Sequence, residues 1–423
     1  MSNKAGVKKV KGAEAVGLVP RLRFPEFLGA GGWEKKRLGE YVRFQAGFPF
    51  DSASFNDEGR GVRLIRNRDL RSDDQRVFYS NQFDGAYLVN NGDLLVGMDG
   101  DFSPQIWVKG RALLNQRVGR VQANDPGARL FVFYFLAVHL KLIEELTART
   151  TVKHLSQAAV ESIIQPMPSL EEQQKIADCL SSLDEVITLE SQRLDALKVH
   201  KKGLMQQLFP AEGETVPRLR FPEFRGAGGW EERRLKDVCE KIMDGTHFSP
   251  TSKSGPRMYL TSKNIQNGVI RLSNVFYISE EEHRHIYDRC PVRREDVLLT
   301  KDGANTGNCA LNNIEFEFSL LSSVAVLRGH PSLLNQHFLY QSIMAPRLQR
   351  VIRESMSGQA ITRITLEKIG GFVIAVATKD EQEKVAGFLT SIDAFIDAAS
   401  QRLDALKNHK DGLMQQLFPP AEV

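Results

Sequence analysis

The heptapeptide QRLDALK occupies residues 192–198 and returns without change at residues 401–407. Two other stretches repeat in the same way, GLMQQLFP at 203–210 and 412–419, and VPRLRFPEF at 19–27 and 216–224. Between these copies the two halves of the chain have drifted far apart in sequence. Shared flanking segments around different contents predict one architecture present twice, each copy with its own specialised part.

Each half closes with a continuous heptad pattern. The pattern positions are separated by alternating steps of four and three residues, as at the a and d positions of a coiled coil. Glu190, Lys201 and Lys410 are polar members of the pattern, which weaken an apolar seam and can fix its register. A helix of this length reaches on the order of 55 Å. The apolar seam residues are Ile176, Leu180, Leu183, Ile187, Leu194, Leu197, Leu204, Val385, Leu389, Ile392, Ile396, Leu403, Leu406 and Leu413.

The two heptad helices are expected to pair with each other. A stripe of this length exceeds what a small α/β domain can cover, and the chain supplies a partner in the same register. The short linker at 211–215 leads from the first helix into the second half, which favours an antiparallel pair with the globular domains at opposite ends. The alternative is that each seam docks only on its own domain.

The stretches before the helices have the pattern of α/β domains. Short apolar runs at 61–65 and 93–96 lie between turn residues and predict strands, and helical patterns follow at 130–146 and 333–352. The predicted fold class is α+β, with two similar α/β domains joined by two long helices in an intramolecular antiparallel coiled coil and a pseudo-twofold repeat. The expected segments are a disordered tail (1–18), a first domain (19–167), its helix (168–210), a second domain (211–377), its helix (378–419) and a tail (420–423).

The composition is that of an ordinary globular protein. The chain has 423 residues, 42% hydrophobic and 26% charged, with a formal net charge of +4, which permits a nucleic-acid partner without requiring one. Its four cysteines have no CxxC spacing, so neither a zinc ribbon nor a disulfide framework is indicated, and a reducing cytoplasm is expected. The longest apolar run, 130–140, is too short to cross a membrane and predicts a buried helix.

The two mixed stretches share apolar anchors but differ in polar residues. Residues 92–100 align with 295–303 and residues 64–70 with 259–265, and in both alignments the apolar positions hold while polar ones change. Arginine and lysine suit guanine, asparagine and glutamine suit adenine, and serine and threonine suit either. Gly-rich or hydroxyl-rich stretches near 147–153 and 355–363 could give backbone N–H and basic contacts to phosphate. The candidate DNA-binding residues are Arg66, Asn67, Arg68, Asn115, Gln116, Arg117, Lys153, Thr261, Ser262, Lys263, Thr300, Lys301, Ser322, Ser323 and Arg363.

Each candidate also has a plainer interpretation, as a polar group of a turn or of the surface. Taken singly, that interpretation is preferred for any one of them. Taken as a set on matched positions of a repeated scaffold, they favour recognition of DNA by both domains.

The sequence contains no recognisable catalytic motif. It lacks a G-x-x-x-x-G-K-[ST] phosphate loop, a G-x-S-x-G elbow, an H-E-x-x-H motif and the Asn-Pro-Pro-aromatic run of amino-methyltransferases. His283, His285 and Cys290 lie close in sequence, but a fourth metal ligand is not evident and the first half has no counterpart. We therefore expect no catalytic residues and no metal site in this chain.

The chain resembles the specificity subunit of type I restriction-modification systems. The residues that carry the resemblance are the Pro-x-x-Glu-Gln segment at 168–177 with its weaker echo at 380–386, and Gly47-Phe48-Pro49-Phe50, His154-Leu155-Ser156, Thr300-Lys301-Asp302-Gly303 and the Arg-Phe-Pro-Glu-Phe segments. The resemblance covers the chain beyond its first dozen and a half residues. One departure is Val376-Ala377-Thr378, where the family usually has prolines, so the resemblance fixes the start of the second helix less firmly than that of the first.

The resemblance implies a non-catalytic subunit. Each α/β domain would be a target recognition domain that reads one half of a bipartite double-stranded DNA sequence. The paired helices would fix the unread spacer and dock two methylation subunits, and two restriction subunits can join that core. S-adenosylmethionine, ATP and magnesium would be used by those partners, and this chain would need no cofactor.

Two other functions fit parts of the sequence. A lone DNA methyltransferase would need a cofactor loop, which is not found. A DNA-independent coiled-coil scaffold would use the helices alone, and salt-dependent binding to duplex DNA would distinguish it from a recognition subunit.

Overall fold

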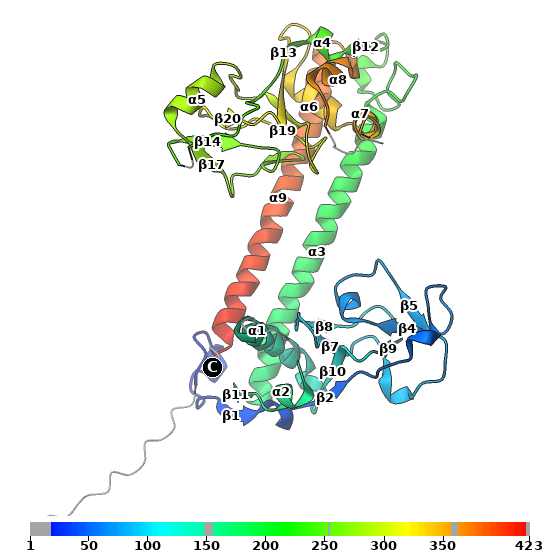
Figure 1. The fold of residues 1–423 in the computed structure, drawn as a ribbon, viewed down its shortest axis with the longest axis vertical. Coiled ribbons are helices and arrows are strands. Elements are labelled where there is room, and N and C mark those ends of the chain that lie inside the picture. The colour runs from blue at the N-terminus through cyan, green and yellow to red at the C-terminus, as the bar shows by residue number, and fades with distance from the viewer. Residues whose placement is uncertain (1–17, 148–154, 253, 357–362, 420–423) are drawn as a thin grey trace, which may run out of the picture. The chain divides into compact units, whose positions relative to one another are not determined.

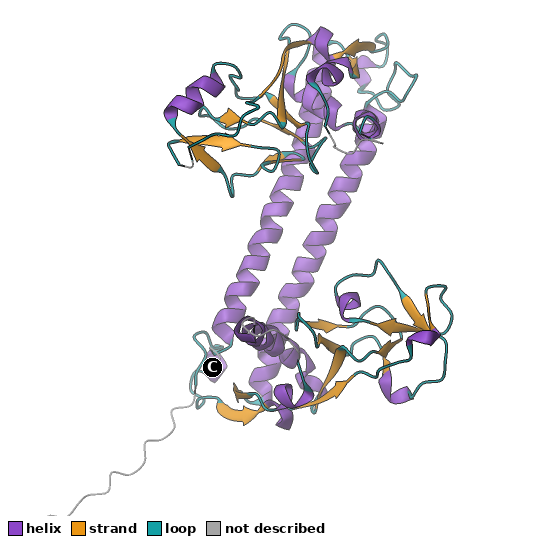
Figure 2. Ribbon diagram, in the orientation of Figure 1, coloured by secondary structure: helices purple, strands orange, loops and turns teal. Residues whose placement is uncertain are grey.

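The computed structural model describes residues 18–147, 155–252, 254–356 and 363–419. The chain divides into two compact units, of which the first contains everything up to Leu189 together with Leu403 onward. The second unit is Glu190–Arg402. Each unit therefore holds one α/β domain and one segment of each long helix, with elements labelled in Figure 1 and coloured by type in Figure 2. Except for Leu18, the predicted tails lie outside the described residues.

The first domain contains a short two-stranded ladder and two larger sheets. A four-stranded sheet has the order β2-β10-β7-β8, and a five-stranded sheet has the order β3-β5-β4-β9-β6, in which β4 and β9 run parallel. The ladder is β1 with β11, which brings the start of the domain next to its end. The strands are β1 (Glu34–Arg37), β2 (Val42–Ala46), β3 (Phe55–Asn56), β4 (Val62–Ile65), β5 (Val77–Tyr79), β6 (Leu88–Val89), β7 (Leu94–Gly97), β8 (Pro104–Ile106), β9 (Ala112–Leu114), β10 (Val118–Ala123) and β11 (Ile164–Met167).

The helices of the first unit cover the four-stranded sheet. They are α1 (Arg129–Thr147), α2 (Gln157–Glu161), the first part of α3 (Leu170–Leu208) and the last part of α9 (Lys379–Leu417). One apolar cluster joins Phe44 of β2, Phe131 of α1 and Ile176 of α3 with Leu417 and Phe418 at the end of the chain. The long helix thus shares its core with the domain that precedes it.

The second domain repeats this plan. A ladder of β12 with β22 closes the domain, and the four-stranded sheet has the order β13-β21-β18-β19. A three-stranded sheet has the order β17-β14-β20, with β14 and β20 parallel, and β15 pairs with β16. The strands are β12 (Glu231–Arg234), β13 (Cys239–Asp244), β14 (Arg257–Leu260), β15 (Ile265–Gln266), β16 (Val269–Ile270), β17 (Phe276–Ile278), β18 (Val297–Thr300), β19 (Cys309–Leu311), β20 (Ser319–Leu320), β21 (Val324–Gly329) and β22 (Val373–Val376).

One helix expected in the second domain is divided in two. The helical pattern at 333–352 predicted a single helix, but the structure has α6 and α7 with a break at Ala345. Pro346 is the cause, because its ring keeps the preceding residue out of helical geometry, and Ala345 has φ −58° and ψ 138°. The helices are α4 (Leu235–Val238), α5 (Glu280–Tyr287), α6 (Gln336–Met344), α7 (Pro346–Glu354), α8 (Leu366–Gly371) and α9 (Lys379–Leu417).

Both long helices begin with the same local hydrogen bond. The amide of Gln173 in the first turn of α3 donates to Pro168 O at 3.0 Å, and the amide of Gln382 in α9 donates to Ala377 O at 2.8 Å. The start of α9 is therefore fixed by this hydrogen bond, although no proline precedes the helix. Both helices are 39 residues long, and each has acidic residues in its first turn, where the helix dipole favours them.

A buried arginine clamps each helix start to the segment that opens the same domain. Both Nε and Nη2 of Arg23 donate to the carboxylate of Glu172 at 2.7 Å, and its Nη1 donates to the carbonyls of Ala30 and Gly31. Both charged side chains are almost fully buried. A bidentate arginine–carboxylate pair holds its two partners in one fixed geometry.

The second unit contains the same clamp. Arg220 donates to Glu381 at 2.7 and 2.8 Å and to the carbonyls of Ala227 and Gly228. The repeated Arg-Phe-Pro-Glu-Phe and Gly-Ala-Gly-Gly-Trp segments therefore have a structural purpose, since together they supply the arginine and the carbonyls that hold it.

Within each unit, segments of α3 and α9 pack antiparallel. In the first unit the start of α3 shares a core with the end of α9, and in the second the end of α3 shares a core with the start of α9. Every predicted seam position is buried or half-buried. The predicted fold class of two α/β domains with an intramolecular antiparallel coiled coil is confirmed.

The two seam lysines form matched ion pairs. Lys410 Nζ lies 2.5 Å from Asp184 Oδ1 in the first unit, and Lys201 Nζ lies 2.5 Å from Asp393 Oδ1 in the second. A domain residue completes each pair, because Tyr134 donates to Asp184 at 2.7 Å and Gln341 donates to Asp393 at 2.8 Å. Removing either partner would leave a half-buried charge, so the pairs specify which stretches of helix can face each other.

One buried histidine has no polar partner among the described residues. His139 of α1 is 2% exposed, neither ring nitrogen is hydrogen-bonded, and its ring lies 4.1 Å from that of Phe135. Burial disfavours the charged imidazolium and lowers the pKa of His139 from 6.5 to about 4. The unfolded chain therefore binds a proton in a pH range where the folded chain does not.

We expect this histidine to make the first unit acid-sensitive. Since the pKa of His139 is lower in the folded state, stability is lost as the pH falls from 6.5 towards 4, by about 2 kcal/mol at pH 5. His139→Leu should abolish that part of the pH dependence in chemical denaturation, whereas the exposed His200→Gln should retain it. Equal pH dependence in the wild type and the His139→Leu variant would contradict the assignment.

Candidate nucleic-acid interface

The parallel pair in the first domain brings three predicted segments together. Strands β4 and β9 run parallel with Ile65 opposite Leu114, so the residues that follow them emerge at the same edge. Residues 98–100, after β7, join them there through three contacts. Met98 N–H donates to Arg117 O at 3.0 Å, the Asn67 amide donates to Asp99 O at 2.6 Å, and Arg117 Nε lies 3.2 Å from Asp99 Oδ2. We call residues 66–68, 98–100 and 115–117 the first polar edge.

The second domain has the same arrangement with different side chains. Strands β14 and β20 run parallel with Leu260 opposite Leu320. Lys301 N–H donates to Ser323 O at 2.9 Å, and Ser262 N–H donates to Ser323 Oγ at 3.0 Å. We call residues 261–263, 301–303 and 321–323 the second polar edge.

Equivalent hydrogen bonds fix the correspondence between the two edges. Asp69 accepts from Arg66 N–H at 2.8 Å, and Asn264 accepts from Thr261 N–H at 2.9 Å. Met98 O accepts from Leu155 N–H at 2.8 Å, just as Lys301 O accepts from Ile364 N–H at 2.8 Å. The backbone is therefore shared, while Arg66, Asn67 and Arg68 are replaced by Thr261, Ser262 and Lys263.

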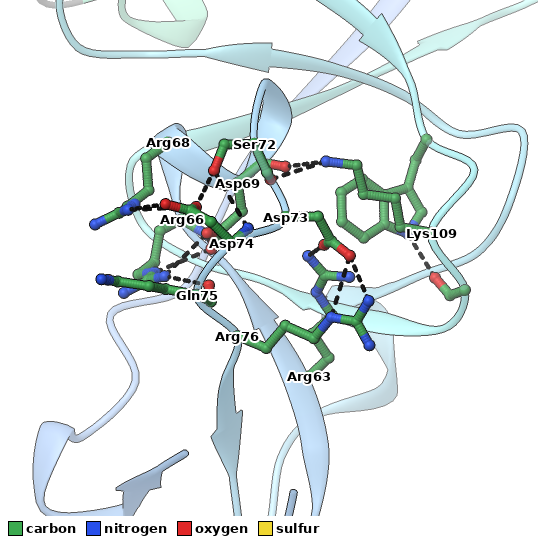
Figure 3. A network of polar contacts seen from close by, with 12 residues as sticks. Arg63, Arg66, Arg68, Asp69, Ser72, Asp73, Asp74, Gln75, Arg76 and Lys109 are labelled. Carbon is green, nitrogen blue, oxygen red and sulfur yellow. Dashed lines mark hydrogen bonds and ion pairs between the residues drawn. The ribbon is translucent and has the colours of Figure 1, made fainter. Parts of the chain in front are cut away.

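A network of arginines and aspartates holds the first polar edge (Figure 3). Arg66 donates through Nε and Nη2 to the nearly buried Asp69, and through Nη2 to Gln75 O at 2.7 Å. Lys109 Nζ donates to the carbonyls of Asp69 and Ser72, which secures the same turn from the other side. Most of the hydrogen-bonding capacity of Arg66 is used within the domain, so this residue positions the edge.

Sequence reasoning missed a second arginine in this network. Arg63 is 7% exposed, pairs with Asp73, and lies 5.0 Å from the ring of Trp107. Arg76 and Arg63 both stabilise the ionised Asp73 and lower its pKa. The alternating charges of residues 66–76 are the sequence signal that could have indicated such a network.

Several predicted contact residues are buried and must be withdrawn. Thr300 is 0% exposed and its hydroxyl donates to carbonyls of the following loop. Lys301 is 2% exposed and its Nζ lies 3.0 Å from Asp244 Oδ2. Ser323 is 7% exposed and its hydroxyl accepts from Ser262 N–H. These side chains organise the second polar edge from inside and do not reach its surface.

Other predicted residues are half-buried and bonded locally. The amide of Asn67 is engaged by Asp99 O, and Asn115 Oδ1 accepts from Gln116 N–H at 2.9 Å. Thr261 and Ser262 are half-buried, and Ser262 O accepts from the Asn305 amide at 3.2 Å. Ser322 is half-buried and its N–H donates to Thr246 O at 2.8 Å.

The exposed candidates are fewer. The side chain of Arg117 is 67% exposed, and that of Arg68 is 48% exposed with Asp74 at 3.3 Å. Gln116 and Lys263 are exposed, and Arg363 is exposed next to Asp302, with which it forms an isolated β-bridge. Lys153 and most of the two phosphate-contact stretches lie outside the described residues.

Each edge includes a further segment that the site prediction omitted. Phe48 forms a parallel bridge to Asn115, and Thr246 forms the equivalent bridge to Leu321. The glycine before each residue is required, because a Cβ at Gly47 would lie 2.0 Å from Asn115 O and one at Gly245 would lie 1.9 Å from Leu320 O. A glycine at the same place in both repeats was the available signal.

The described residues contain neither a cluster of metal ligands nor a membrane-spanning helix. Within the described ranges, no group of three or more His, Cys, Asp or Glu side chains could hold a metal ion, and His283 Nδ1 instead lies 2.9 Å from Ser319 Oγ. In the same part of the chain, no helix has the length and apolar character needed to span a membrane.

Comparisons with known proteins identify the family. The model of the type I restriction modification DNA specificity domain matches twice, over residues 30–199 and 227–408. The chain is 25% identical to the type I restriction enzyme EcoBI specificity subunit of Escherichia coli, over 92% of this chain and 85% of that one. It is 23% identical to the MjaVIII specificity subunit of Methanocaldococcus jannaschii, over 94% and 93%.

A solved structure has the same fold. The crystal structure of the type I restriction-modification S subunit from M. genitalium aligns with a TM-score of 0.60 and 16% identity, over 96% of this chain and all of that one. The chain therefore belongs to the family of specificity subunits of type I restriction-modification systems, and is the non-catalytic DNA specificity subunit of such a complex.

Arg117 and Arg66 were both predicted to contact DNA, but the structure gives them different surroundings. Arg117→Ala should weaken DNA binding by the restriction-modification complex and lower the slope of log K against log salt by about 0.9 if one phosphate contact is lost. Its melting temperature should not change, because Arg117 is 67% exposed. Arg66→Ala should instead destabilise the chain by roughly 1–3 kcal/mol, because Asp69 loses a charged partner.

Salt-titrated DNA binding and thermal unfolding of both variants test this distinction. An Arg117→Ala variant that unfolds early while retaining its DNA affinity would reverse the two assignments.

Proposed function

We propose that each α/β domain reads one half of a bipartite, asymmetric double-stranded DNA target. The observation that carries this proposal is the pair of matched polar edges, which have the same backbone hydrogen bonds but different side chains. The first edge offers the exposed Arg68, Gln116 and Arg117, and the second offers the exposed Lys263 and the half-buried Ser322. Arginine and lysine both suit guanine, whereas glutamine suits adenine and serine suits either, so the base preference differs most between Gln116 and its counterpart Ser322.

Contacts to the phosphate backbone of the DNA would accompany this recognition of bases. Phosphate contacts position a protein on the duplex without reading its sequence, and exposed basic side chains supply them. The exposed Arg363 is a candidate for this purpose in the second domain, and Lys153 lies in the matching stretch of the first domain's sequence. The half-buried Asn67, Asn115, Thr261 and Ser262 would hold the reading side chains in position, with direct base contact limited to their accessible edges.

The coiled coil would fix the length of the unread spacer and dock the methylation subunits. The half-buried pairs Lys410–Asp184 and Lys201–Asp393 support this proposal, because they tie specific positions of the two helices together. A ruler needs a fixed register, and a slipped register would leave these charges unpaired.

Catalysis would belong to partner proteins in the cytoplasm. Two methylation subunits would use S-adenosylmethionine, and two restriction subunits, where present, would use ATP and magnesium. Family membership supports this division of labour, since the chain itself is the non-catalytic specificity subunit. The four free cysteines are consistent with a reducing compartment.

Methylome sequencing of cells that express the chain with its methylation subunits tests the central proposal. We expect a bipartite motif with two different half-sites, because the two polar edges differ at every exposed reading position. Exchanging the exposed Arg68 and Gln116 for their counterparts, as Arg68→Lys and Gln116→Ser, should alter only the first half-site. A motif with two identical half-sites would contradict the asymmetry.

A second test addresses the spacer. One added heptad near the middle of both α3 and α9 lengthens each helix by about 10 Å, which corresponds to roughly three base pairs of B-DNA. We expect the methylated motif to keep both half-sites and gain about that many unread positions. A heptad added to α3 alone is the matched control, since it breaks the register and should abolish methylation. An unchanged spacer in the double insertion would argue against the ruler.

A further inference from the structure

The second domain has a hollow beside its polar edge. Its volume is about 440 Å³ and its wall is mostly apolar, with Tyr259, Phe276, Tyr277, Ile278 and Leu321 among the lining residues. Thr261 belongs both to this lining and to the second polar edge. A ligand in the hollow would therefore lie next to DNA bound at that edge. Pockets of this size, apolar with few polar groups, are typical of sites for small planar ligands.

The equivalent place in the first domain is filled by the protein itself. Strand registers match Leu64 with Tyr259 and Tyr79 with Ile278. In the first domain Phe50 packs onto these positions, with its ring 4.8 Å from that of Tyr79, and is only 8% exposed. Phe248 is the counterpart of Phe50 but is 77% exposed. The hollow is therefore a specific feature of the second domain.

Tyr259, which lines this hollow, has a buried hydroxyl without a partner among the described residues. Tyr259 is 4% exposed, and its hydroxyl has no hydrogen-bond partner in the described part of the chain. Burial raises the pKa of Tyr259 to about 12, so the group is a protonated donor at neutral pH. A buried donor without an acceptor is costly, and its counterpart in the first domain is a leucine. An acceptor on a ligand would satisfy this hydroxyl.

The rim of the hollow is aromatic and open. Phe276 is 61% exposed and Tyr277 is 46% exposed, although both flank an apolar wall. Exposed aromatic rings beside nucleic acid are suited to stacking on bases, which every base permits because each has a π face. The exposed Lys263 at the same edge adds positive charge where DNA would approach.

We propose that the hollow binds one nucleobase of the second half-site, swung out of the base stack. The inference rests on the proposed DNA recognition by this domain and adds a means of recognition that the first domain lacks. The base would stack against Phe276, and one of its carbonyl or ring-nitrogen acceptors would receive the Tyr259 hydroxyl. Unstacking a base costs free energy, and stacking in an aromatic pocket with a satisfied hydrogen bond offsets that cost.

A double-mutant cycle, in which the base and the Phe276 ring are removed separately and together, tests this proposal in the intact complex. Duplexes containing the target mapped by methylome sequencing would carry an abasic site at each position of the second half-site in turn. Phe276→Ala should weaken binding to the intact duplex roughly 5- to 150-fold. At one position the abasic duplex should bind wild type and variant equally, because the base that the ring contacts is missing. Tyr259→Phe should show the same positional dependence with a smaller loss, roughly 2- to 12-fold.

A matched control and three results define the outcome. Phe316→Ala removes another exposed phenylalanine of the same domain, 55% exposed and outside the hollow, and should leave binding unchanged on every duplex. Losses for Phe276→Ala that are equal at every abasic position, or no loss at all, would overturn the base site. A Phe248→Ala variant that melts earlier without DNA would also overturn it, because Phe248 would then fill the hollow as Phe50 fills its counterpart.

Failure of DNA recognition and failure of the base site give different binding results. If the wild-type complex does not distinguish its mapped target from a scrambled duplex, the proposed recognition itself fails. If the wild type discriminates but no abasic position couples to Phe276, only the base site fails.

Discussion

Both units depend on covering the apolar stripe of a 39-residue helix. Each α/β domain covers one part, and a segment of the other long helix covers the rest. The buried pairs Arg23–Glu172 and Arg220–Glu381 set how each helix leaves its own domain, because each arginine also holds two backbone carbonyls of the opening segment. The repeated sequences are those that make these contacts, which gives a physical reason why they are alike in both halves.

The same scaffold carries two different polar edges because its fixed points are backbone atoms. The carbonyls and N–H groups that join the strand ends do not depend on side-chain identity. Interior residues beneath the edges can change as well. The first domain has Met98 and Ala46 in its apolar cluster, whereas the second has the buried ion pair Lys301–Asp244 at the matched positions. In both domains these two interior positions are therefore filled without an unpaired charge.

Charged residues near the edges serve two purposes that sequence alone does not separate. Arg63 and Arg66 are enclosed against Asp73 and Asp69 and organise the loop, whereas the side chain of Arg117 is 67% exposed beside Asp99. Each of the three arginines has an aspartate partner, so the difference lies in how far each arginine side chain is buried. A contact set chosen by residue type therefore includes residues that build the interface together with those that could use it.

The sequence by itself determined the repeat, the two heptad helices and their pairing, and the α/β character of each domain. These follow from local periodicity and from identical segments, which need no knowledge of distant neighbours. The sequence also indicated the segments that form the polar edges, because alternating apolar anchors mark where strands end. Only the tertiary structure decided which side chains face outward. Lys301 is buried because Asp244 lies across from it, and Phe248 is exposed where Phe50 is packed. Such outcomes depend on neighbours far apart in the chain, and these neighbours meet only after the strands have paired.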